Sequence, residues 1–137
     1  MASYKPVVVM ANGVFDIFHI GHLLYLQEAK RMGDKLVVSI TDDAHVDKGP
    51  GRPLFNAHQR AAIIHELRCV DDVLIVPGAL EALEIVRPDI FVKGADYVGK
   101  IEERHSGYCK ANDIKIRFTN QPLFSTTEII NARLGSR

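Results

Sequence analysis

The 137-residue sequence contains no tryptophan, only two cysteines and no excess of charge of either sign. Its 17 Lys and Arg residues balance 17 Asp and Glu residues, so the formal net charge is zero. Such a balance argues against a protein that binds nucleic acid or anionic membranes over a broad surface, although a local pocket can still hold a small anion. The sequence also lacks an apolar run of the roughly 20 residues that a membrane-spanning helix needs.

The N-terminus and the cysteines favour a cytoplasmic protein. The first six residues lead directly into an apolar segment, without the layout of a signal peptide. Cys69 and Cys109 are isolated, and no Cys/His spacing suggests zinc. We therefore expect reduced structural thiols, no metal site built by the protein alone, and neither a nucleic-acid nor a membrane partner.

The composition is that of one folded domain. A hydrophobic content of 47% with zero net charge is too apolar for a disordered chain. A chain of this length can bury roughly two-thirds of its unfolded surface. We find no internal repeat, low-complexity tract or linker, and we predict a single domain over residues 1–137.

Short apolar runs bounded by turn residues alternate with segments of helical period along the whole chain. The predicted strands are residues 7–11, 35–40, 72–76, 89–92 and 114–118. The predicted helices are residues 20–32, 56–67, 79–86, 101–112 and 126–134. This alternation predicts an α/β fold, namely an open parallel sheet of about five strands with helices on both faces. Ligands of such folds bind beyond the carboxyl ends of the strands, so loops 12–19, 41–55 and 93–100 should converge.

The segment after the first strand is the sharpest motif, and it reads Gly13-Val14-Phe15-Asp16-Ile17-Phe18-His19-Ile20-Gly21-His22. Its two histidines are three residues apart at the start of a helix, so they share one face. Unpaired backbone N–H groups and the helix dipole favour an anion there, and Gly21 lets a phosphate approach the backbone. A zinc pair or two surface histidines are the alternatives, but no third zinc ligand has a supporting spacing.

Basic residues in the second loop are candidates for phosphate binding. Lys48 can neutralise a phosphate as a point charge, while Arg52 can bind one through two parallel hydrogen bonds. Arg60 lies near the start of the next helix, where its own helix dipole disfavours it, so a phosphate partner would explain it. The alternative for this Gly/Pro-rich segment is an ordinary solvated loop. We expect residues 42–55 to form a mobile lid.

The pattern G-x-F-D-x-x-H-x-G-H resembles the signature of the cytidylyltransferase-like nucleotidyltransferases. Three further segments resemble other motifs of that family in the expected order, and they are residues 55–60, Lys93-Gly94-Ala95-Asp96-Tyr97, and Ser125-Thr126-Thr127. The resemblance therefore extends along nearly the whole chain. It implies a Rossmann-like fold.

The resemblance also implies roles for individual residues. His19 and His22 would contact the nucleotide phosphates and stabilise the transition state for attack on the α-phosphorus. Asp16 would lie near the reacting phosphates. The remaining nucleotide-binding residues that the resemblance implies are Gly13, Val14, Phe15, Gly21, Lys93, Gly94, Asp96, Ser125, Thr126 and Thr127.

Two of these segments have simpler interpretations as well. Lys93 and Asp96 can form a surface ion pair. Ser125 can cap the last helix with Glu128 as its capping-box partner, which is compatible with an anion site at the same helix terminus.

Two branches of the family resemble this chain. The heptose 1-phosphate adenylyltransferases resemble it in the Asn12-Gly13 pair, residues 48–53 and residues 93–97. The glycerol-3-phosphate cytidylyltransferases share its length, but they usually carry Arg-Thr where this chain has Asn120-Gln121. Adenylyl transfer to a sugar phosphate is thus favoured slightly over cytidylyl transfer to glycerol 3-phosphate or another phosphorylated small molecule.

The resemblance further implies ATP or CTP as the nucleotide, pyrophosphate as the product, Mg²⁺ carried with the nucleotide, and a homodimer. A non-catalytic nucleotide-binding module is the alternative from another functional class.

Overall fold

The computed structural model describes residues 4–120, which form a five-stranded, all-parallel sheet in the order β3-β2-β1-β4-β5. The strands are β1 (Val8–Gly13), β2 (Lys35–Thr41), β3 (Asp72–Val76), β4 (Ile90–Lys93) and β5 (Lys115–Phe118). The α-helices are α1 (Ile20–Lys30), α2 (Ala57–His65), α3 (Ala79–Val86) and α4 (Glu103–Ala111). Two short 3-10 helices are η1 (Asp43–His45) and η2 (Ala95–Tyr97). The predicted Rossmann-like α/β class is confirmed.

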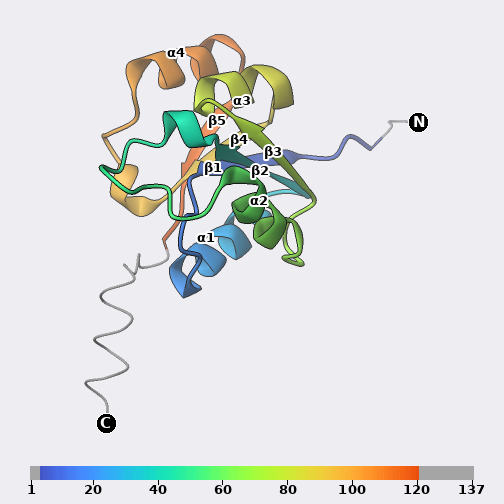
Figure 1. The fold of residues 1–137 in the computed structure, drawn as a ribbon. Coiled ribbons are helices and arrows are strands. Elements are labelled where there is room, and N and C mark those ends of the chain that lie inside the picture. Colours follow the sequence, from blue (N-terminus) through green and yellow to red (C-terminus); the bar gives the residue numbers. More distant parts are fainter. Residues whose placement is uncertain (1–3, 121–137) are drawn as a thin grey trace.

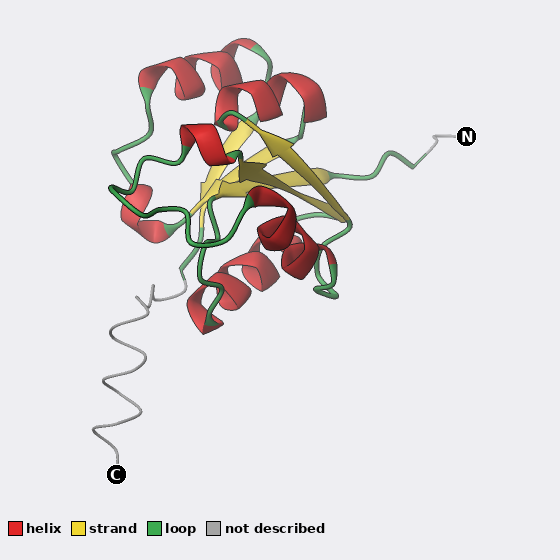
Figure 2. Cartoon of the chain, in the orientation of Figure 1, coloured by secondary structure: helices red, strands yellow, loops and turns green. Residues whose placement is uncertain are grey.

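Helices cover both faces of the sheet, with α1 and α2 on one side and α3 and α4 on the other (Figures 1 and 2). The alternation of side chains along β1 produces these two cores. Val9 and Ala11 face the core that includes Leu26 of α1, whereas Met10 faces the core that includes Leu83 of α3. All five side chains are completely buried, which explains why the strands are continuous apolar runs.

The strand order places a topological switch point at β1. The chain runs outward from β1 through β2 to β3, then crosses back to β4 on the other side of β1. Loops from the two halves of the sheet diverge at the carboxyl ends of β1 and β4. Open α/β sheets bind their ligands in the crevice at such a point.

The main local difference from prediction lies at Asn12 and Gly13, which fall in the predicted loop 12–19. Both residues continue β1 instead and pair in register with Ser39 and Ile40 of β2. Side-chain hydrogen bonds from Asn12 to Ser39 support this extension. Asn56 and Gln59 cap the start of α2 through both hydrogen bonds of a capping box. The predicted helix at 126–134 lies outside the described residues.

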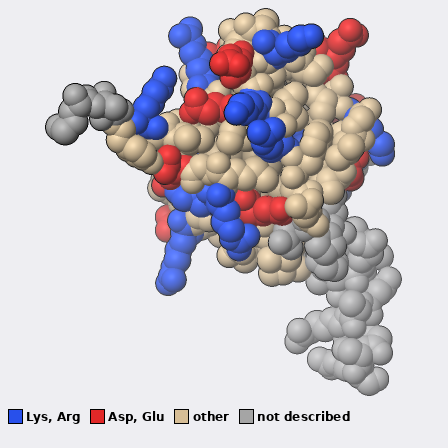
Figure 3. Space-filling model, turned by 180° about the vertical axis from the view of Figure 1, so that it is seen from behind, with Lys and Arg blue, Asp and Glu red and all other residues tan. Residues whose placement is uncertain are grey.

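The surface is consistent with the balanced charge. Basic and acidic side chains intermingle over the face shown in Figure 3. Among residues 4–120, no helix has the length and apolar character needed to cross a bilayer.

Candidate active site

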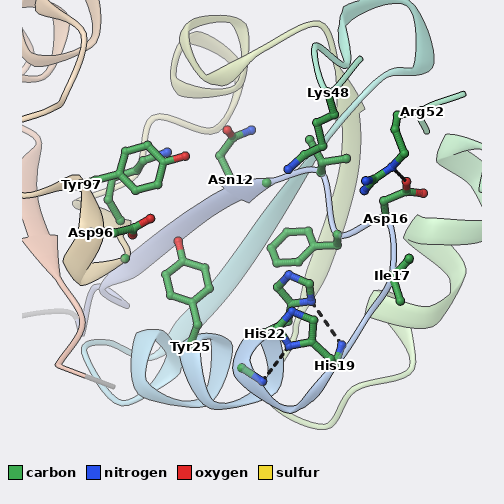
Figure 4. A pocket seen from close by; sticks show the side chains of 16 residues that line it. Asn12, Asp16, Ile17, His19, His22, Tyr25, Lys48, Arg52, Asp96 and Tyr97 are labelled. Atoms are coloured by element: carbon green, nitrogen blue, oxygen red, sulfur yellow. Dashed lines mark hydrogen bonds and ion pairs between the residues drawn. The ribbon is translucent and has the colours of Figure 1, made fainter. Parts of the chain in front are cut away.

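A cavity of about 490 Å³ opens at the switch point (Figure 4). All three predicted loops reach it. Residues 12–17 come from the end of β1 and the loop after it, Lys48 and Arg52 come from the loop after β2, and residues 93, 94, 96 and 97 come from the end of β4 and the turn after it. His19 and His22 at the start of α1 complete the lining next to these loops. The convergence predicted from the strand order is therefore present.

The two histidines cap α1 with their own side chains. Nδ1 of His19 accepts a hydrogen bond from the Gly21 N–H at 3.0 Å, and Nδ1 of His22 accepts one from the His19 N–H at 3.2 Å. Because both Nδ1 atoms accept, each neutral ring must carry its proton on Nε2. The rings stack with centroids 3.9 Å apart. Both rings line the cavity, and each carries an Nε2–H donor.

The environment keeps both rings neutral in the protein without ligand. Burial, together with the nearby positive charges of His19 and Lys48, lowers the pKa of His22 to about 4. Burial also lowers the pKa of His19. A phosphate in the cavity would raise both pKa values, but protonation of Nδ1 would break the two capping hydrogen bonds. The neutral rings can therefore stabilise negative charge through their Nε2–H groups.

Phe15 packs against this pair of rings and explains the glycine before it. Its ring meets His22 edge-on with centroids 5.2 Å apart, and its backbone φ of 52° lies in the left-handed region. A Cβ atom on Gly13 would lie 2.7 Å from the Phe15 ring. Gly13 is thus required by a close side-chain approach at the end of a strand.

Asp16 anchors the loop after β2. Its buried carboxylate accepts hydrogen bonds from Arg52 Nε at 2.7 Å, the Leu54 N–H at 2.8 Å and the Phe55 N–H at 2.9 Å. Burial opposes ionisation, but these two N–H groups and the guanidinium hold the pKa of Asp16 below its usual value. In this structure Asp16 and Arg52 neutralise each other at the cavity wall.

Arg60 does not reach the cavity, contrary to the predicted phosphate contact. Its side chain is 1% exposed and donates hydrogen bonds to the main-chain oxygens of Val14, Thr41 and Phe55 and to the Asp43 carboxylate. These partners come from the loop after β1 and from both ends of the segment that joins β2 to α2. Arg60 therefore holds those loops together, and the structure corrects its predicted role.

Lys93 and Asp96 both line the cavity, as predicted, but the simple ion pair between them does not form. The Lys93 ammonium lies 4.1 Å from the centroid of the Tyr97 ring. Burial lowers the pKa of Lys93, and the negative charges of Asp96 and Glu102 oppose that shift. Lys93 is a partly desolvated cation held by an aromatic ring within the cavity.

Comparison with known proteins assigns the chain to a family. The model of the family described as "Cytidylyltransferase-like" matches residues 10–132 of the sequence. The chain belongs to the cytidylyltransferase-like family. The resemblance that rests on the G-x-F-D-x-x-H-x-G-H motif is confirmed.

Relatives of this cytidylyltransferase-like chain include longer proteins. "Bifunctional protein HldE" of Syntrophotalea carbinolica is 43% identical over 117 residues, which cover 78% of this chain and 24% of that protein. The protein of the same name from Pseudomonas fluorescens Pf-5 is 49% identical over 99 residues, covering 69% of this chain and 21% of that protein. The chain thus spans about a quarter or less of the length of these curated relatives.

A solved structure supports the same fold. The "lipopolysaccharide core biosynthesis protein" from Thermoplasma volcanium superposes with a TM-score of 0.72 at 31% identity. The match covers 88% of this chain and all of that one.

Tyr25 and Tyr97 are cavity residues that sequence reasoning missed in this cytidylyltransferase-like chain. Tyr25 lines the cavity, and its buried hydroxyl donates to the Val92 main-chain oxygen at 2.8 Å. Its spacing of three residues from His22 was an available signal, because such residues share a helix face. Tyr97 lay inside a quoted motif, but its contact with Lys93 depends on the local 3-10 turn.

The remaining predicted residues divide into two groups. Gly13, Val14, Gly21 and Gly94 line the cavity as expected. Ser125, Thr126 and Thr127 lie outside the described residues, so their predicted phosphate contacts remain predictions.

The side chains of the site do not form a metal cage by themselves. Within residues 4–120 there is no group of three or more His, Cys, Asp or Glu side chains that could hold an ion. The Asp16 carboxylate is already occupied by three donors, whereas Asp96 lies exposed at the cavity. This donor set fits a Mg²⁺ ion whose ligands are mainly phosphate oxygens and water.

Proposed function

We propose that this chain is a nucleotidyltransferase that transfers the nucleoside monophosphate of an NTP to the phosphate of a small molecule. An oxygen of the acceptor phosphate forms a bond to the α-phosphorus, the bond from that phosphorus to the bridging oxygen breaks, and pyrophosphate leaves. We further propose ATP as the nucleotide and a heptose 1-phosphate-like sugar phosphate as the acceptor. Cytidylyl transfer to glycerol 3-phosphate is the alternative within the same chemistry.

The observation that carries the proposal is the histidine pair at the start of α1. Two Nε2–H donors and the positive end of the helix dipole lie where a triphosphate can meet them. Negative charge that builds up during the displacement is stabilised by such preorganised donors, which need no reorientation. Lys48 and Lys93 add positive charge to the same cavity, where two phosphorylated substrates must approach each other.

The relatives support the choice of acceptor. The chain is 43–49% identical to proteins named HldE, and the solved relative is named for lipopolysaccharide core biosynthesis. The sequence branch that this chain resembles in Asn12-Gly13 and in residues 93–97 transfers adenylyl groups to heptose 1-phosphate. We propose in addition a single cytoplasmic domain over residues 1–137, a homodimer, Mg²⁺ carried with the nucleotide, and no nucleic-acid partner.

A pyrophosphate-release screen tests the proposal. Four nucleoside triphosphates are crossed with phosphorylated sugars, polyols and amino alcohols, in Mg²⁺ and in excess EDTA. We expect release that depends on ATP, on a sugar 1-phosphate and on the divalent cation. Release that depends on CTP and glycerol 3-phosphate would support the alternative instead. Nucleotide binding without release for any acceptor would identify a non-catalytic binding module, and full turnover in EDTA would exclude the metal.

A further inference from the structure

The side chain of Asn12 is fixed in one orientation at the end of β1. Its Nδ2 donates hydrogen bonds to Ser39 Oγ at 2.7 Å and to the Ser39 main-chain oxygen at 3.4 Å. Because a main-chain oxygen can only accept, these bonds identify which end of the amide is nitrogen. Ser39 is completely buried in β2, so packing sets its position. Oδ1 of Asn12 is therefore directed away from β2.

This oxygen is an unused acceptor in the cavity. Asn12 lines the cavity, and its Oδ1 has no hydrogen-bond partner among residues 4–120. It is also not one of the fully buried unpaired atoms of that part of the chain, so it is accessible from the cavity that Asn12 lines. In Figure 4, Asn12 lies between Lys48 on one side and Tyr97 with Asp96 on the other. A fixed acceptor in such a place can recognise a ligand that brings a hydroxyl or N–H donor.

The alternation of side chains along β1 indicates which substrate reaches Oδ1 of Asn12. Asn12 follows Met10 on the sheet face that α3 and α4 cover, whereas the two histidines belong to α1 on the opposite face. In an in-line displacement at phosphorus, the attacking and leaving oxygens lie on opposite sides. If the histidines hold the nucleotide phosphates, the attacking acceptor enters from the side of Asn12.

Lys93 lies on the same side of the sheet as Asn12. The β1–β4 register pairs Ala11 with Val92, so the next residues in each strand, Asn12 and Lys93, are neighbours. Lys93 also follows Phe91 by two residues, which places it on the same sheet face as Asn12. A partly desolvated ammonium beside a fixed amide oxygen matches a ligand that carries a phosphate close to a hydroxyl.

We propose that Asn12 is a specificity-determining residue of the acceptor site, whose Oδ1 accepts a hydrogen bond from a sugar hydroxyl of the phosphorylated acceptor. Ser39 acts as its positioning residue. This inference rests on the proposed function, since it takes the histidines to hold the nucleotide. A phosphorylated acceptor without that hydroxyl would leave Oδ1 unpaired and is disfavoured for that reason.

Binding measurements test this role without requiring turnover. The full chain is saturated with an ATP analogue that has a methylene bridge between the α- and β-phosphorus atoms. It is then titrated calorimetrically with heptose 1-phosphate and with its monodeoxy analogues, one for each hydroxyl. We expect the wild-type protein to bind one monodeoxy analogue about tenfold more weakly than the parent, as loss of one hydrogen bond predicts. Asn12→Ala should bind the parent about tenfold more weakly and no longer distinguish that analogue.

Two further variants keep the result interpretable. Ser39→Ala removes the 2.7 Å partner of the Asn12 amide and should reduce discrimination against the same analogue, which a general loss of stability would not do. Asn112→Ala is the matched control, because its amide donates to the Tyr108 oxygen at the exposed end of α4, outside the cavity. It should bind every ligand as the wild-type protein does.

Other results would overturn the inference. These are equal weakening of all analogues by Asn12→Ala, absence of sugar phosphate binding to the wild-type protein, or a loss that follows 2′- or 3′-deoxy forms of the nucleotide instead. Failure of the proposed function has a different signature. The sugar phosphate would bind with the Asn12-dependent preference, while no acceptor in the release screen would yield pyrophosphate.

Discussion

At the scale of single residues, the histidine pair combines a structural and a chemical task. The Nδ1 atoms of His19 and His22 satisfy N–H groups at the start of α1, and this leaves Nε2–H as the donor toward the cavity. A serine or aspartate could cap the helix equally well but would present no second donor. The use of histidine for a cap is therefore an indication of function at this position.

Replacement of His22 tests the chemical task. His22→Ala should lower kcat by about 10²–10⁴-fold, because a donor aimed at developing charge is lost. His19→Ala should behave similarly, and the double variant should lose less than the product because both act on one phosphate. His58→Ala on the exposed face of α2 is the control and should keep wild-type kinetics. A folded His22→Ala enzyme that loses less than about threefold would remove His22 from the mechanism.

The low pKa of His22 also predicts a pH dependence of stability. The folded pKa of about 4 lies below the ordinary value of 6.5, so the unfolded chain takes up the proton first as the pH falls. The stabilisation present above pH 6.5 should decline between pH 6.5 and about 4. We expect a loss of about 1–2 kcal/mol from this group, less than the full shift implies because the ring is partly solvated. Urea unfolding at several pH values should show a smaller decline for His22→Gln, whose amide can still accept the capping hydrogen bond; equal declines would contradict this.

At the scale of elements, residues 42–55 consist of an anchored part and an exposed part. Asp16 anchors Arg52, Leu54 and Phe55, while Lys48 lies on an exposed stretch between η1 and Arg52. Gly49 and Gly51 adopt φ values of 90° and 77°, which side chains rarely tolerate. We propose that the stretch around Lys48 is the part of the lid that moves, hinged on the Asp16 anchor.

Lys48 should matter for catalysis and not for folding. Lys48→Ala should cost about 2–4 kcal/mol in kcat/KM, the range for one strong donor to developing charge. The melting temperature should barely change, because an exposed lysine contributes little to stability. Limited proteolysis should cut near Gly49, and nucleotide with acceptor should slow the cut. Lys110→Ala on exposed α4 is the control, and wild-type kinetics for both Lys48→Ala and Arg52→Ala would reduce the loop to a connector.

Arg60, unlike Lys48, should matter for stability, because its buried side chain connects the loop after β1 with the segment between β2 and α2. Arg60→Met should destabilise the fold by about 3–5 kcal/mol, since it leaves the Asp43 carboxylate and three main-chain oxygens without their donor. Thermal and urea unfolding measure this loss. The exposed Arg104, paired with Glu102, provides a control whose replacement by methionine should cost less than about 1 kcal/mol. An Arg60→Met protein of wild-type stability and weakened phosphate binding would restore the original phosphate hypothesis.

At the scale of the whole molecule, we expect a homodimer. The strongest support is the family resemblance, and β3, which is an edge strand of the sheet formed by residues 4–120, adds a physical reason. An edge strand presents unpaired N–H and C=O groups, and the apolar side chain of Ile85 lies exposed next to the same edge. Light scattering after gel filtration should give twice the mass of the chain over a range of concentrations. A mass that stays monomeric at high concentration would contradict the prediction.

The sequence by itself determined the features that depend on local periodicity and local capping. Burial on both faces requires continuous apolar strands such as residues 35–40, and the spacing of Asn56 and Gln59 encodes a cap within four residues. The G-x-F-D-x-x-H-x-G-H motif likewise lies within ten consecutive residues, so its position after the first strand could be predicted. Fold class and the location of the cavity followed from these short-range patterns.

Only the tertiary structure decided which distant groups meet. Arg60 bonds to Val14 across 46 positions, and Asp16 to Arg52 across 36, so neither partnership is visible in local spacing. Ser39 orients the Asn12 side chain through a hydrogen bond, although it lies 27 positions away in the sequence and is paired with Asn12 only by the sheet register. The sequence shows that an arginine is charged and that an asparagine is polar. Whether that group binds a ligand or a loop depends on the backbone oxygens and hydroxyls that long-range packing brings within hydrogen-bond distance.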